Sequence, residues 1–183
     1  LSFSLSSISS SFSKSYFRKS KLKKYLTAQR LRERMNYDPR TGHFTWIDGP
    51  RAGKRAGSLC KTTGYIILGI DGRTYRAHRC AWLWQYGVWP IDEIDHVNRV
   101  RDDNRFANLR EATRAENNRN RGTAHLNQTG KKGVLFNRLT GLHSATIMCD
   151  GEVFDLGLHK TSAAAHAAYA RASRILHGEF GCT

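Results

Sequence analysis

The spacing of apolar residues after position 26 changes between helical and strand periods. Thr27 precedes "AQRLRERM", in which Leu31 and Met35 share one face, so this segment predicts a helix capped by Thr27. The Pro and Gly of "YDPRTG" end it. A strand is then predicted in "HFTWI", a hairpin in "GYIILGIDGRTYRAH" that turns at Asp71-Gly72, and a helix in "RCAWLWQYG" that ends near Gly87.

Residues 91–121 read "IDEIDHVNRVRDDNRFANLREATRAENNRNR" and predict a short unit of two strands and a helix. "EIDHV" is typical of a strand with apolar flanks, "VNRVRDDNRFA" of a polar loop and "NLREA" of a returning strand. Thr113 and Glu116 form a capping box, so a helix is expected from Thr113 to about Arg121.

Beyond a linker-like stretch over 122–132, the pattern starts again. "GVLFNR", "SATIMCD" and "EVFDLGLH" predict three strands, of which the last two turn at Asp150-Gly151. Thr161 then caps the Ala-rich segment "SAAAHAAYARASRILHG", which predicts a helix ending at Gly178. Small Ala side chains allow this helix to pack closely on the three-stranded sheet, and the second domain begins near Gly130.

These patterns predict an α+β protein with a tail and two domains. The tail covers residues 1–24, the first domain 25–121, the linker 122–132, and the second domain, a small three-stranded antiparallel sheet with one helix, 133–183. The tail is Ser-rich and basic, with Glu33 the first acidic residue of the chain, and is expected to be disordered. An organelle-targeting segment is the alternative, and Leu1 in place of Met indicates an upstream extension or a fragment.

Charge narrows the class of partner. Thirty Lys and Arg against fifteen Asp and Glu give a net charge of +15 and a pI near 10.2, which favours a polyanion, above all nucleic acid. No apolar run approaches the roughly 20 residues that cross a bilayer, so a membrane partner is not expected. The cysteines form no C-x-x-C pair, so neither a zinc knuckle nor a disulfide framework is indicated, and a reducing cytoplasm fits.

The candidate chemistry lies in residues 91–121. Asp95 is a hard oxygen ligand suited to Mg²⁺, and His96 can take a proton near neutral pH. Neighbouring strand residues point to opposite faces, so both serve one site only if the strand ends or bends there, which the loop from Asn98 allows. Arg114 and Asn117 lie three apart at the start of the predicted helix, where a phosphate would be favoured.

The segment "IDHVNRVRDDNRFANLREATRAENNRNR" resembles the core motif of phage-type HNH endonucleases, also called His-Me finger or ββα-metal nucleases. The upstream stretches "LTAQRLRERMNYDPRTGHFTW" and "YRAHRCAWLWQYGVWP" resemble the amino-terminal half of such proteins. The resemblance extends over roughly residues 25 to 121 and implies a ββα-metal nuclease domain there.

The resemblance also implies roles for individual residues. Asp95 and Asn117 would bind the metal, His96 would be the general base, Asn108 would support the motif and orient the histidine, and Arg114 would contact the phosphate. His78 is a second histidine found in similar phage proteins, although a structural role in the core is expected for it.

The implied reaction is hydrolysis of a phosphodiester in double-stranded DNA with one Mg²⁺ or Mn²⁺ per active site. His96 must be neutral to act as the base, so activity is expected to fall below the histidine pKa, near 6.5 if unperturbed. A monomer or weak dimer is expected, and a monomer would nick a single strand.

Residues 133 to 180 resemble the AP2 DNA-binding domain in the form that follows phage HNH nucleases. "GV", "ATI", "DLG" and "AAAHAAYARASRILHGEF" carry the likeness. His143 and Ser144 replace the usual Trp and Arg, so two readings stay open: the domain binds with weaker sequence discrimination than that family, or its sheet only helps to hold the catalytic domain on DNA. Basic residues of both domains are the candidate DNA contacts, namely Arg110, Arg119, Arg121, Lys131, Lys132 and Arg138.

The sequence thus predicts a metal-dependent DNA endonuclease of the phage or homing type, acting in the cytoplasm of a host cell. Two alternatives stay open at this stage. The chain could be a catalytically inactive DNA-binding regulator that retains the nuclease fold. An RNA-binding protein would also be basic, but the aromatic signatures of common RNA-binding modules are absent from the sequence.

Overall fold

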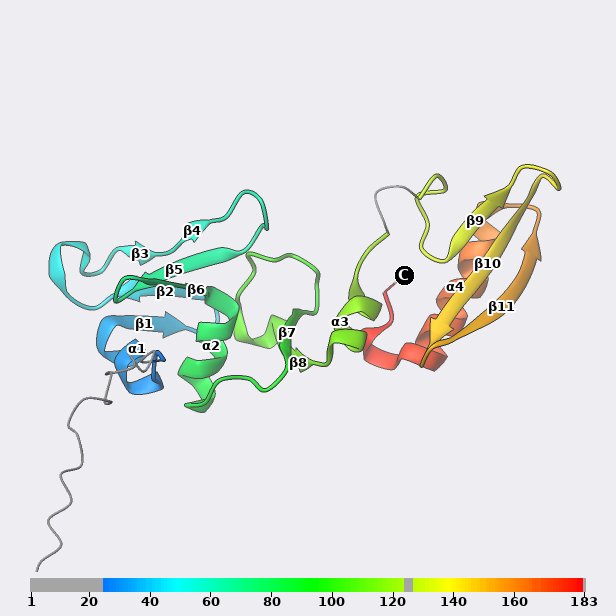
Figure 1. Cartoon of the computed structure of the whole chain (residues 1–183). Helices are drawn as coiled ribbons and strands as arrows, with labels where there is room; N and C mark the ends of the chain where they lie inside the picture. Colours follow the sequence, from blue (N-terminus) through cyan, green and yellow to red (C-terminus); the bar gives the residue numbers. More distant parts are fainter. Residues whose placement is uncertain (1–24, 124–126, 183) are drawn as a thin grey trace, which may run out of the picture.

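The computed structural model describes residues 25–123 and 127–182, which form two lobes (Figure 1). The first lobe extends from Tyr25 to the helix α3 (Arg114–Asn120). The second lobe follows the gap and begins at Asn127, where the described residues resume. The predicted tail over 1–24 and His125 lie outside the described residues. None of the helices within the described ranges is long and apolar enough to cross a membrane.

The first lobe opens with the predicted helix. Helix α1 (Ala28–Arg34) starts where the Thr27 side chain accepts a hydrogen bond from the Arg30 backbone N–H, and its own Leu31 is fully buried. The strands β1 (Met35–Asp38), β2 (His43–Trp46) and β3 (Arg55–Ala56) form one antiparallel sheet. A short 3₁₀ turn, η1 (Gly49–Arg51), lies between β2 and β3.

A second sheet and a helix complete this part of the lobe. The sheet consists of β4 (Ser58–Leu59), β5 (Ile66–Ile70) and β6 (Arg73–Arg76). The helix α2 (Ala77–Tyr86) follows β6 directly. The predicted hairpin turns at Asp71 and Gly72, both with positive φ (49° and 74°), as a type I′ turn requires. Helix α2 ends at Gly87 in the left-handed conformation, as predicted.

The strands β1, β3 and β4 were absent from the sequence prediction. Strand β1 follows α1 directly, with no Gly or Pro between them to mark a boundary. The other two contain only two residues each, which is too short for an alternating pattern to be recognised. Met35 of β1 and Ala56 of β3 nevertheless join the main core, whereas both residues of β4 are exposed.

The unit predicted over 91–121 forms as expected. Strand β7 (Glu93–His96) pairs antiparallel with β8 (Leu109–Ala112), and this register places Asp95 opposite Arg110 and His96 opposite Leu109. The 3₁₀ turn η2 (Phe106–Asn108) leads into β8. Helix α3 begins with the predicted capping box between Thr113 and Glu116.

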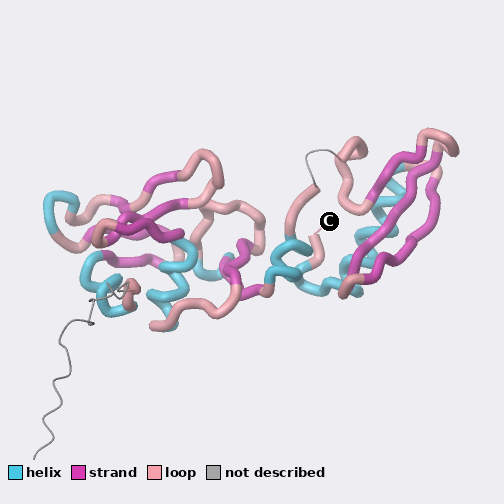
Figure 2. The backbone as a smooth tube through the Cα atoms, viewed as in Figure 1, coloured by secondary structure: helices cyan, strands magenta, loops and turns pink. Residues whose placement is uncertain are grey.

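The second lobe is the predicted sheet with one helix (Figure 2). Its strands β9 (Val134–Asn137), β10 (Leu142–Cys149) and β11 (Glu152–His159) are antiparallel in the order β11-β10-β9. Helix α4 (Ser162–His177) is capped by Thr161, and its buried Ala165 and Ala168 lie against the sheet. A 3₁₀ turn, η3 (Gly178–Phe180), follows α4.

Polar contacts join the two lobes around α3. The Lys132 ammonium donates to the backbone oxygens of Arg119 (2.5 Å) and Arg121 (2.6 Å). Arg119 also pairs with Asp150, at 2.6 Å, in the β10–β11 turn. The chain end η3 lies beside α3 (Figure 1), so the second lobe reaches the unit that carries the candidate chemistry.

Candidate active site

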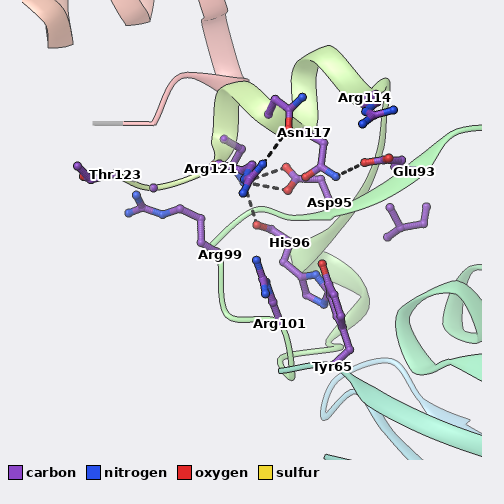
Figure 3. Close-up of a pocket in the computed structure, with 14 residues that line it drawn as sticks. Tyr65, Glu93, Asp95, His96, Arg99, Arg101, Arg114, Asn117, Arg121 and Thr123 are labelled. Atoms are coloured by element: carbon purple, nitrogen blue, oxygen red, sulfur yellow. Dashed lines mark hydrogen bonds between the residues drawn. The ribbon is translucent and has the colours of Figure 1, made fainter. Parts of the chain in front are cut away.

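Asp95 and His96 end strand β7, and both side chains line a cavity of about 720 Å³. Figure 3 shows Asp95 beside α3, whereas the His96 ring lies toward Tyr65. They therefore point in different directions, as neighbours on a strand must, and reach one cavity because the chain turns after β7. Both are nearly buried, with exposed fractions of 5% and 4%.

Two side chains fix the Asp95 carboxylate. The Arg110 guanidinium donates from Nε (3.0 Å) and Nη2 (2.9 Å) to Oδ2 of Asp95 across the β7–β8 pair. The Asn120 amide donates to Oδ1 (3.0 Å) and Oδ2 (2.9 Å) of Asp95 and to the His96 backbone oxygen (2.9 Å). A buried carboxylate needs such partners, since an unpaired buried charge is strongly destabilising.

The His96 ring is held by Asn104. Its Nε2 lies 3.3 Å from the Asn104 side-chain oxygen, which can only accept, so in this arrangement Nε2 carries the proton and Nδ1 keeps its lone pair. Asn104 is itself buried, and its backbone oxygen accepts a hydrogen bond from the Tyr37 hydroxyl at 2.7 Å. Burial lowers the pKa of His96 below its usual 6.5, outweighing the Asn104 hydrogen bond and the Asp95 charge that act in the other direction.

His78 packs edge-on against His96, with the ring centroids 5.0 Å apart. Its exposed fraction is 3%, and its Nδ1 has no hydrogen-bond partner among the described residues. Burial lowers the pKa of His78 to about 3. His78 is thus a neutral core residue that walls one side of the His96 ring.

Asn108 acts on the loop between β7 and η2. Its side-chain oxygen accepts from the Asn98 backbone N–H (2.9 Å), and its amide donates to the Asn98 side-chain oxygen (2.9 Å) and the Asp103 backbone oxygen (2.8 Å). It thus clamps both ends of the loop segment that leads to Asn104. The hydrogen bond to the His96 ring comes instead from Asn104, which was not among the residues predicted from the sequence.

Helix α3 supplies the opposite wall of the cavity. Arg114, which is exposed, and Asn117 both line it, as their three-residue spacing predicted. The Asn117 amide donates to the carboxylate of Glu93, another residue of the wall. Asn120 lies one further turn along the same face, a spacing that could have revealed it in the sequence.

The donor set of this cavity suits a hard divalent cation. Asp95 and Glu93 offer carboxylate oxygens and Asn117 an amide oxygen, while Mg²⁺ is commonly held by one or two carboxylates together with water. Within the described residues no three His, Cys, Asp or Glu side chains gather as a metal-binding group. A cation here would therefore depend on few protein ligands.

The candidate DNA contacts occupy different environments. Arg121 lines the cavity and is exposed, and Arg138 is exposed after β9. Arg119 and Lys132 are engaged between the lobes, and burial lowers the pKa of Lys132. Arg110 is paired with Asp95 and its side chain is 14% exposed, and Lys131 is half-buried.

Two further arginines, to which the sequence patterns assigned no role, line the cavity. Arg99 and Arg101 come from the loop that follows His96, and Arg101 lies over the Tyr65 ring at 5.3 Å. Their position directly after the Asp-His pair was the available signal. With Arg114 and Arg121 they bring four arginines to the lining of the cavity.

The comparisons with known proteins found a match in the first lobe alone. A model of the HNH endonuclease family matches residues 75–119, from the end of β6 into α3. The matched range contains Asp95, His96, Asn108 and Asn117. Searches of curated proteins and of solved structures found no match. Residues 75–119 of this chain are an HNH endonuclease domain.

Proposed function

We propose that the protein hydrolyses phosphodiester bonds in double-stranded DNA with the help of a divalent metal ion. The observation that carries the proposal is that Asp95, His96 and Asn117 line one cavity together with four arginines. A family match to HNH endonucleases and a net charge of +15 support the same substrate class.

His96 is the proposed general base. The Asn104 oxygen holds the Nε2–H, so Nδ1 is the atom that would take a proton from the attacking water. The lowered pKa keeps the ring neutral at pH 7, which a base requires. Asn108 assists from a distance by holding the loop that carries Asn104.

Asp95 and Asn117 are the proposed metal ligands, and Mg²⁺ or Mn²⁺ is the proposed ion. Within the described residues, Oδ1 of Asp95 accepts from Asn120 alone and so keeps capacity for another ligand. Asn117 ligates through its oxygen without adding charge. A divalent ion bound there would stabilise the negative charge that develops on the phosphate and on the leaving oxygen.

The four arginines that line the cavity are proposed to hold the DNA backbone. Arg114 begins α3 and Arg121 directly follows it, whereas Arg99 and Arg101 lie on the loop after His96, on another side of the cavity. Such contacts add affinity without reading sequence and weaken with salt. Arg110 is omitted from this group because its guanidinium is engaged with Asp95.

The second lobe is proposed to be an AP2-like domain that keeps the nuclease on DNA. A three-stranded sheet backed by one helix supports this, and the exposed Arg138 and the half-buried Lys131 are available to phosphates. The exposed large side chains of the sheet are mostly apolar, namely Leu135, Phe136, Met148, Val153, Phe154 and Leu158. We therefore propose weak sequence discrimination by this lobe.

Supercoiled plasmid distinguishes a nuclease from a DNA-binding regulator. The wild-type protein is incubated with plasmid in Mg²⁺, Mn²⁺ or EDTA, and binding in EDTA is followed by gel shift. Open-circular product in the metal samples alone is expected, because one active site attacks one strand. A gel shift without cleavage in either metal would contradict the proposal and favour the regulator.

A further inference from the structure

The turn η3 at the end of the second lobe touches the side chain that fixes Asp95. The Phe180 ring lies against the Arg110 guanidinium, with 3.8 Å between the guanidinium carbon and the ring centroid. The Glu179 backbone oxygen accepts from Nη1 of Arg110 at 2.9 Å. This turn therefore contacts Arg110 both by its ring and by its main chain.

The same guanidinium uses its other donors on Asp95. Nε and Nη2 donate to Oδ2 of Asp95, while Nη1 is turned to Glu179. Arg110 thus lies between Phe180 and the carboxylate, and its side chain is 14% exposed. The planar guanidinium has a fixed donor geometry, so whatever sets its plane also sets the hydrogen bonds that reach Asp95.

A second contact holds the same chain end. The Arg99 guanidinium, in the loop after His96, contacts the sulfur of buried Cys182. Residues 178–182 therefore touch both β8 and the loop that leads from the proposed base. The second lobe is joined in this way to the proposed metal site as well as to the surface of α3.

We propose that Phe180 is a positioning residue of the nuclease site, which acts through Arg110 to orient the Asp95 carboxylate toward the metal ion. The inference rests on the proposed role of Asp95 as a metal ligand. Side chains that orient a metal ligand commonly change metal affinity by about 10- to 100-fold when they are removed. Removal of Phe180 leaves every ligand in place but frees the plane of Arg110.

The test is Mn²⁺ binding by the full-length protein without DNA, measured from the electron paramagnetic resonance signal of free Mn²⁺. Phe180→Ala is expected to weaken binding about tenfold, and Phe180→Tyr, which keeps the ring, to stay within about twofold of wild type. Phe154→Ala on β11 is the matched control, an aromatic truncation in the same lobe away from the site, and should bind as wild type does.

Further variants distinguish a failure of this inference from a failure of the proposed metal assignment. Asp95→Ala should abolish the binding; if it binds Mn²⁺ as wild type does, the metal assignment of the proposed function fails and the inference with it. If Asp95→Ala loses Mn²⁺ while Phe180→Ala binds within twofold of wild type or more tightly, the inference alone is overturned. If Phe180→Ala does not fold, Phe180→Leu decides by the same criterion, since it keeps apolar bulk without the aromatic face.

If Phe180 acts through Arg110, its effect on Mn²⁺ binding depends on Arg110. A merely structural role of Phe180 would not produce this dependence. Arg110→Lys keeps the charge but loses the two-pronged contact with Asp95. Adding Phe180→Ala to Arg110→Lys should weaken Mn²⁺ binding no further, because the route through Arg110 is already broken. Additive losses would show that Phe180 acts by another path and would overturn the proposal.

Discussion

Replacement of Asn120 by Ala is the sharpest test of the packing around Asp95. The Asn120 amide is buried and donates to Asp95 and to the His96 backbone oxygen. A hydrogen bond to a charged group contributes about 1.5–3 kcal/mol and a neutral one about 1 kcal/mol, so the loss should be about 3 kcal/mol of unfolding free energy. For a chain of this size that corresponds to a fall in Tm of about 6–12 °C.

Asn118→Ala on the same helix provides the control. Asn118 is exposed, and its substitution brings the same small gain in helix propensity, so the difference between the two variants isolates the buried contacts. Urea unfolding is followed by tryptophan fluorescence, which reports on the first lobe because Trp46, Trp82, Trp84 and Trp89 all lie there. A difference below about 1 kcal/mol would refute the role assigned to Asn120.

Three further predictions follow from single features of the first lobe. Gly42→Ala should reduce both stability and cleavage, because Gly42 has φ of +73° and an added Cβ would lie 2.3 Å from the Asn104 backbone carbon; unchanged melting and cleavage would contradict this. His78 has a pKa of about 3 in the folded protein against 6.5 for an ordinary histidine, so the neutral ring contributes fully to the free energy of unfolding above pH 6.5. This contribution is lost as the pH falls toward 3. Between pH 6.5 and 4.5, the free energy of unfolding in urea should therefore fall by about 2 kcal/mol more for wild type than for His78→Leu. An equal fall in both proteins would show that protonation of His78 is not the cause. Arg114→Ala should weaken DNA binding and lower the slope of log K against log salt by about 0.9, whereas an unchanged slope would place Arg114 away from phosphate.

Local signals in the sequence were sufficient for most of the secondary structure. The Thr113–Glu116 capping box and the Asp150–Gly151 turn involve residues close in sequence, and both formed as predicted. The strands β3 and β4 could not be found in this way. Each is held by its pairing with a neighbouring strand, and two residues are too few to show an alternating pattern.

The arrangement around Asp95 depends on contacts between distant residues. Its pairing with Arg110 follows from the β7–β8 register, which the sequence pattern alone did not specify. Asn104 reaches His96 because the loop folds back under the clamp of Asn108. The contact of Phe180 with Arg110 joins residues 70 positions apart in sequence (180 − 110) and depends on how the lobes meet.

Single-turnover nicking of supercoiled plasmid by His96→Ala tests the central claim most directly. His43→Ala, which replaces an exposed histidine on β2, is the matched control. With Mg²⁺ present and DNA binding equal by gel shift, His43→Ala should nick at the wild-type rate and His96→Ala at least about 100-fold more slowly, since general base catalysis contributes about 10²–10⁴-fold. Nicking by His96→Ala at the wild-type rate would contradict the assignment of His96 as the base.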